Sequence, residues 1–86
     1  MDAKDVIKLL EALSGAGWAT REGWIYAPKG TMWLRCSQPW HEDLSSFRER
    51  MVGRLGRLRR QDGFDDGVAD TQSLVDILER IASAAS

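Results

Sequence analysis

The side chains best suited to catalysis or metal binding gather at one point in the chain. Cys36 and His41 are the only cysteine and the only histidine, and they lie five residues apart. They could supply two ligands to a metal ion, but a closed zinc site needs four, and the chain has no further cysteine or histidine. We therefore expect no metal site and no bound cofactor.

The run His41-Glu42-Asp43 contains residue types used in general acid–base catalysis. It also fits the start of a helix, where acidic side chains meet the positive end of the helix dipole. We favour the helix start, with Pro39 in its first turn or Asp43 as its cap. On this interpretation the chain has no catalytic residue and is not an enzyme.

Arginines form a second candidate site. Arg50, Arg54 and Arg57 recur at helical spacing, which places three guanidinium groups along one flank of a helix. Such a stripe could follow the phosphates of RNA or DNA. The alternative is a solvated face whose charge is balanced by the acidic segment 61–86, and the net charge of −1 favours this alternative.

Four tryptophans lie in the segment from Gly17 to Trp40. We expect Trp18 and Trp24 in the core. Trp33 and Trp40 are candidates for exposed rings that anchor a partner or stack on a base.

Two turn signals divide this tryptophan-rich segment into strands. Ala27-Pro28-Lys29-Gly30 favours a tight hairpin, and Arg21-Glu22-Gly23 is a weaker signal of the same kind, because glycine accepts a left-handed backbone. We predict a three-stranded antiparallel meander with strands at residues 18–21, 24–27 and 31–36.

The register of the second hairpin decides which side chains share a face. We predict that Ala27 pairs with Thr31, which puts five residues on the core face: Trp24, Tyr26, Met32, Leu34 and Cys36. Ile25 and Trp33 then share the outer face and, with Trp40, form the predicted partner-binding site. A slip of one residue would exchange the two faces.

Apolar residues at helical spacing follow and precede the meander. They predict helices at residues 3–14, 43–60 and 71–83, with a loop at 61–69. Asp2 is expected to cap the first helix, and Asp70 or Thr71 the third. We predict one α+β domain that spans residues 1–86. Its elements are a helix, the three-stranded meander and then two helices packed on the sheet, with the third helix at a flank.

Composition limits the location of the protein. The sequence holds no apolar run long enough to cross a membrane, and one cysteine allows no internal disulfide. We therefore expect a cytoplasmic protein that does not bind membranes.

Part of the first third of the chain resembles a known family. Lys4-Asp5-Val6-Ile7-Lys8-Leu9-Leu10, Gly17-Trp18, Gly23 and Ile25-Tyr26 are similar to the start of the HicA-type mRNA-interferase toxins. The resemblance implies a helix, three strands and a helix arranged as in double-stranded-RNA-binding domains, and RNA as a ligand. The family's catalytic histidine follows the glycine matching Gly23, whereas Trp24 follows here, so ribonuclease activity is not implied.

These features together predict a small non-enzymatic interaction module that binds a protein partner or itself as a homodimer. The alternative is an RNA- or DNA-binding module that uses the arginine-rich second helix.

Overall fold

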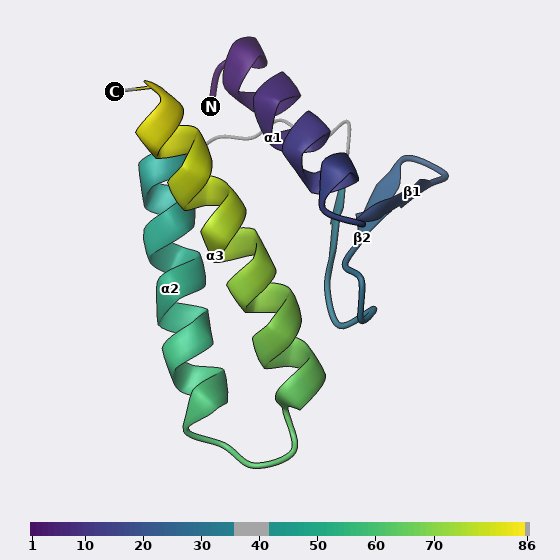
Figure 1. Cartoon of the computed structure of the whole chain (residues 1–86), viewed down its shortest axis with the longest axis vertical. Coiled ribbons are helices and arrows are strands. Elements are labelled where there is room, and N and C mark those ends of the chain that lie inside the picture. Colours follow the sequence, from purple (N-terminus) through teal and green to yellow (C-terminus); the bar gives the residue numbers. More distant parts are fainter. Residues whose placement is uncertain (36–41, 86) are drawn as a thin grey trace.

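The computed structural model describes residues 1–35 and 42–85. The elements are α1 (Ala3–Gly15), β1 (Ala19–Arg21), β2 (Trp24–Tyr26), β3 (Trp33–Arg35), α2 (Leu44–Arg59) and α3 (Asp65–Ala85) (Figure 1). This order confirms the predicted α+β fold class. Among the described helices, none combines the length and the apolar character needed to cross a membrane.

Side-chain and backbone caps define both ends of α1. Asp2 is the N-cap, and its carboxylate accepts the backbone N–H of Asp5 at 2.9 Å. At the other end Gly17 has a left-handed φ of +90°, which lets the Trp18 N–H donate to the Leu13 carbonyl at 3.1 Å. This closing pattern satisfies carbonyls that the helix would otherwise leave unpaired and turns the chain into β1.

The longest helix, α3, occupies the centre of the molecule. It packs along α2 and also against α1, so it lies between the two other helices instead of at a flank (Figure 1). It begins at Asp65, inside the predicted loop, because Asp65 and Asp66 fit the first turn of a helix and Gly67 lies close to Leu58. Asp70 therefore lies within the helix, and the prediction that it caps the helix is wrong.

One core joins the three helices to β2. Apolar side chains of α1, α2 and α3 are buried in it, together with Trp18, Ile25 of β2 and two residues that flank the hairpin turn. Its members are Leu9, Leu13, Trp18, Ile25, Ala27, Met32, Phe47, Met51, Leu55, Leu74, Val75, Ile77 and Leu78.

The three strands form an antiparallel sheet in the order β1-β2-β3, as predicted. Glu22 and Gly23, with φ of +53° and +83°, form the two-residue turn between β1 and β2. Positive φ at both positions matches the twist of the flanking strands. Arg21 and Trp24 consequently face each other directly across this hairpin.

The second hairpin is one residue out of the predicted register. Gly30 has the expected left-handed φ of +74°, and its N–H donates to the Ala27 carbonyl at 2.9 Å. However, Ala27 bonds to Met32 and not to Thr31, so Ile25 pairs with Leu34. The physical reason is that the backbone N–H of Thr31 is bound by Asp70 of α3, which keeps Thr31 in the loop.

The slip reverses the faces of β2, whereas β3 keeps its predicted faces, with Leu34 toward the core and Trp33 exposed. Ile25 and Leu34 face the helices, and Ile25 is only 3% exposed. Trp24 and Tyr26, which were expected in the core, are half-buried on the other face. The sheet therefore presents aromatic side chains on the side away from the helices.

Candidate binding surface

Two rows of side chains make up the side of the sheet that faces away from the helices. Strand pairing aligns Ala19, Tyr26 and Trp33 in one row, and Arg21, Trp24 and Arg35 in the other. These six residues alternate along the strands with those that face the helices. We call them the outer sheet face, and it contains three aromatic, two cationic and no acidic side chains.

Both arginines of the outer sheet face lie over aromatic rings. The guanidinium carbon of Arg21 is 5.1 Å from the ring centre of Tyr26, and that of Arg35 is 5.5 Å from the ring centre of Trp24. These distances are within the range of cation–π attraction. A stacked guanidinium keeps N–H groups at its edge, where they can donate to carboxylate or phosphate oxygens.

Trp33 is the most accessible ring of this surface. Its side chain is 57% exposed, whereas Trp24 and Tyr26 are half-buried. Trp33 lies on β3, an edge strand of the sheet, and pairs with Tyr26 of the neighbouring strand β2. An exposed indole next to two stacked arginines is a compact patch of the residue types that dominate binding interfaces.

The three predicted partner-binding residues do not come together. Trp33 is exposed as expected, but Ile25 is buried on the opposite face because the register differs by one residue. Trp40 lies outside the described residues, as do Cys36 and His41. Arg21 and Arg35 were not predicted as site residues.

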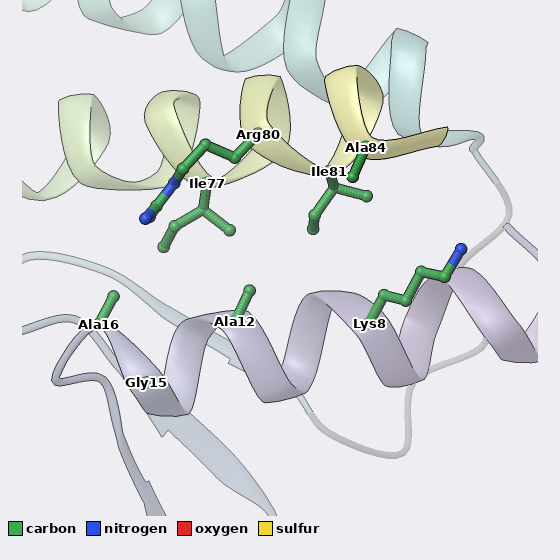
Figure 2. Close-up of a pocket in the computed structure, with 8 residues that line it drawn as sticks. All are labelled: Lys8, Ala12, Gly15, Ala16, Ile77, Arg80, Ile81 and Ala84. Atoms are coloured by element: carbon green, nitrogen blue, oxygen red, sulfur yellow. The ribbon is translucent and has the colours of Figure 1, made fainter. Parts of the chain in front are cut away.

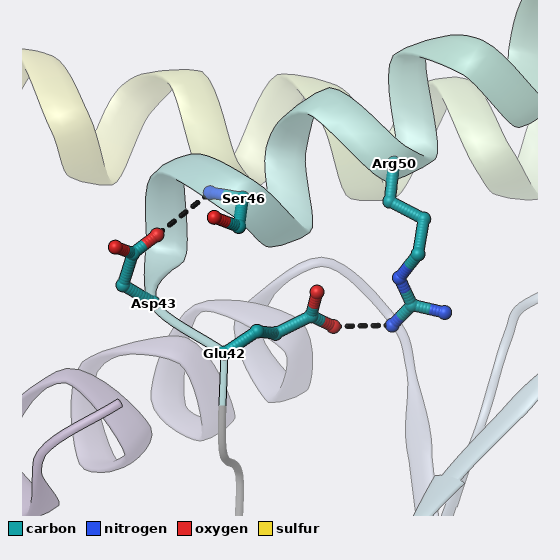
Figure 3. Close-up of polar contacts among 4 residues, drawn as sticks. All are labelled: Glu42, Asp43, Ser46 and Arg50. Atoms are coloured by element: carbon teal, nitrogen blue, oxygen red, sulfur yellow. Dashed lines mark hydrogen bonds and ion pairs between the residues drawn. The ribbon is translucent and has the colours of Figure 1, made fainter.

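The predicted arginine stripe on α2 does not present three equivalent free cations. Arg50 forms an ion pair with Glu42 and lies with its guanidinium carbon 5.3 Å from the ring centre of Phe47 (Figure 3). Arg54 is half-buried, and its Nε atom is buried without a hydrogen-bond partner. Of these three described arginines, only Arg57 is exposed without such a contact, so the stripe is a poorer phosphate-binding surface than its spacing suggested.

The acidic segment does not neutralise these arginines by direct ion pairs. Within residues 1–35 and 42–85, no arginine of α2 forms an ion pair with an acid of α3. The polar link between the two helices instead runs from Arg59, which donates to Gln72, and from Gln72, which donates to Asp76 at 2.8 Å. The charge balance between the stripe and this segment stays a prediction from the sequence, since the described residues show no direct ion pair behind it.

Glu42 and Asp43 have structural partners at the start of α2. The Asp43 carboxylate accepts the backbone N–H of Ser46 at 2.7 Å, which confirms Asp43 as the N-cap (Figure 3). The hydrogen bond from this N–H lowers the pKa of Asp43 below its ordinary value. Glu42 is held by Arg50. Both acids thus act in helix capping and ion pairing, which gives acid–base catalysis no support here.

Comparison with known proteins adds no relative: no family model, no curated protein and no solved structure matches the chain. The resemblance to the HicA-type toxins stays a prediction from sequence.

Proposed function

We propose that this protein is a non-enzymatic interaction module that binds a protein partner through the outer sheet face. The observation that carries the proposal is the exposed ring of Trp33 beside two arginines that already lie over aromatic rings. Tryptophan, tyrosine and arginine supply most of the binding energy at protein interfaces. Pre-positioned side chains also lose less conformational freedom on binding.

The charge of the outer sheet face indicates the chemistry of the partner. Arg21 and Arg35 are exposed, and no acidic residue shares their face. A partner with carboxylates around an apolar pocket would therefore complement this surface. A two-fold homodimer through the same face is disfavoured, because each arginine would meet the cationic surface of the second copy.

Single-stranded RNA or DNA is the second candidate ligand. The specific observation in its favour is the combination of stacked rings and guanidinium groups on a sheet, a pattern used for base stacking and phosphate binding. The site would then be the outer sheet face and not Arg50, Arg54 and Arg57. We favour a protein because only one ring of the outer sheet face is more than half exposed and the net charge of the chain is −1.

The experiment begins with cross-linking and affinity capture using the full chain and its Trp33→Ala variant, followed by titration with the purified captured protein. The double variant Arg21→Glu/Arg35→Glu tests the positive charge of the outer sheet face. Arg57→Glu is the control, because it reverses the charge of an arginine on α2, away from that face. We expect the affinity to fall at least tenfold for the sheet-face variants, or about 1.4 kcal/mol. The control should retain its affinity.

A parallel fluorescence titration with a random-sequence single-stranded RNA at low salt tests the second candidate. If the RNA quenches the fluorescence only when Trp33 is present, and less so at higher salt, the ligand of the outer sheet face is nucleic acid and not a protein. A captured protein that binds Trp33→Ala as well as the parent would contradict the proposal.

A further inference from the structure

A groove between α1 and α3 forms a hollow separate from the outer sheet face. Its volume is about 470 Å³, and it is lined by Lys8, Ala12, Gly15, Ala16, Ile77, Arg80, Ile81 and Ala84. Figure 2 shows Ile77 and Ile81 projecting from α3 toward Ala12 of α1 and Ala16, the residue that caps its C-terminal end. The floor and walls of the groove are therefore aliphatic.

Side-chain size explains why the two helices leave this space. Ala12, Gly15 and Ala16 line the α1 side and offer at most one methyl group each. Leu9 and Leu13, on the buried side of the same helix, are completely buried in the core. The helices are thus held together by the core while their outer edges stay apart.

Two cations distinguish this groove from a bare apolar surface. Lys8 and Arg80 stand at its opposite ends (Figure 2). No acidic residue lines the groove, and in the described part of the chain neither Lys8 nor Arg80 belongs to an ion pair. An occupant that is apolar in the middle and anionic at an end would complement both features.

We infer that this groove binds a free single-chain amphiphile with an anionic headgroup, of the class of medium-chain fatty acids. The volume falls within the roughly 300–1,000 Å³ of small-molecule sites. The α1 side extends from Lys8 to Ala16, or about 12 Å at the helical rise. A helix of that length and about 10–12 Å in diameter has a volume of at least about 900 Å³, which exceeds the groove volume of about 470 Å³, whereas a single alkyl chain is much thinner.

The first test is an NMR titration of the uniformly ¹⁵N-labelled full chain with sodium decanoate below its micelle concentration. We expect saturable shifts at the backbone amides of Ala12, Ala16 and Ile81. Decyltrimethylammonium has the same chain with a positive headgroup and should bind at least tenfold more weakly. Octanoate lacks two methylenes and should bind up to about 15-fold more weakly, at about fourfold for each buried methylene.

Charge reversal then tests the two cations. The Lys8→Glu/Arg80→Glu variant should bind decanoate at least tenfold more weakly. Because one carboxylate reaches only one end of the groove, one of the two single reversals should account for most of this loss. Lys4→Glu, which changes an exposed lysine of α1 outside the groove, is the matched control and should stay within twofold of the parent. Circular dichroism of each variant checks that the helices are intact, which is expected because both cations are exposed.

Three outcomes would overturn the inference. The first is the absence of saturable shifts at groove amides with decanoate. The second is binding that does not depend on charge, so that decanoate and decyltrimethylammonium bind equally or the double reversal leaves the affinity for decanoate unchanged. The third is binding to vesicles of anionic phospholipid without binding to decanoate, which would assign the groove to a membrane surface. None of these outcomes depends on Trp33, so the inference and the proposed function stand or fall separately.

Discussion

The carboxylate of Asp70 ties α3 to the hairpin loop through Thr31, 39 residues away in the chain. One carboxylate oxygen accepts both the backbone N–H of Thr31 at 3.0 Å and its hydroxyl at 2.6 Å, and the other accepts the Lys29 N–H at 2.9 Å. Asp70 is 1% exposed. Because these bonds hold Thr31 in the loop, they set the register of β3 and hence the face on which Trp33 lies.

Asp70→Ala should destabilise the protein by about 2–4 kcal/mol, because it leaves loop N–H groups without their acceptor. Thr31→Val removes the hydroxyl and keeps the backbone bond, so its cost should be about 1–2 kcal/mol. Urea denaturation gives both values, and the double variant should show that the two effects are not additive. Asp76→Ala, on the exposed side of α3, is the control, and a loss as large as that of Asp70→Ala would contradict this role.

The sequence was sufficient for the elements whose stability is local. Helix α1, with its cap Asp2, and helix α2, with its cap Asp43, follow from apolar spacing and side-chain oxygens at the correct position. The start of α3 was missed because Gly67 and the neighbouring aspartates are typical of a loop. In the folded chain Gly67 is buried near Leu58, a contact that depends on tertiary packing.

The candidate site was predicted only in part for the same reason. Trp33 was recognised as an exposed ring, but Ile25 was placed beside it because a hairpin register cannot be read from turn residues alone when both strands are apolar on both faces. The deciding contact comes from Asp70, which looked like a helix cap. A buried aspartate that binds a distant loop leaves no local pattern in sequence.

The same glycine-to-alanine change should have opposite effects at two positions. Gly56 lies inside α2, and a Cβ built there meets no atom within 4 Å, so Gly56→Ala should stabilise the protein by about 1 kcal/mol. Gly30 has a φ of +74°, and Gly30→Ala should cost about 1–2 kcal/mol. Thermal denaturation followed by circular dichroism measures both. A destabilised Gly56→Ala variant would indicate that something approaches this side of α2.

The N-cap Asp43 should make stability depend on pH in the acid range. Its pKa is lowered in the folded state, first by the hydrogen bond from the Ser46 N–H, so the folded chain favours the charged form. The stabilisation is present above the ordinary aspartate pKa of about 3.9 and is lost as the pH falls through the lowered value. Asp43→Asn still caps the helix but does not titrate.

Urea denaturation of the parent and of Asp43→Asn between pH 6 and pH 2 measures this contribution. The advantage of the parent over the variant should shrink as the pH falls below about 4. A difference that is constant over the whole range would exclude the charge of Asp43 as its source.

The last prediction compares Trp33 with Ile25, which occupy opposite faces of the sheet. Ile25→Ala opens a space in the core and should cost about 2–5 kcal/mol of unfolding free energy. Trp33→Ala removes a larger side chain from a residue that is 57% exposed, so it should cost less than about 1 kcal/mol, mainly through the lost cross-strand pair with Tyr26.

Quenching by iodide provides an independent check on the same two positions. The parent should lose a readily quenched component of its tryptophan fluorescence when Trp33 is replaced, whereas Trp18→Phe should leave that component in place because Trp18 is buried. If Trp33→Ala proved as destabilising as Ile25→Ala, the predicted register with Ile25 and Trp33 on one face would regain support. In that case Trp33 would not be an exposed ring of the outer sheet face, and the proposed binding surface would have no exposed aromatic side chain to contact a partner.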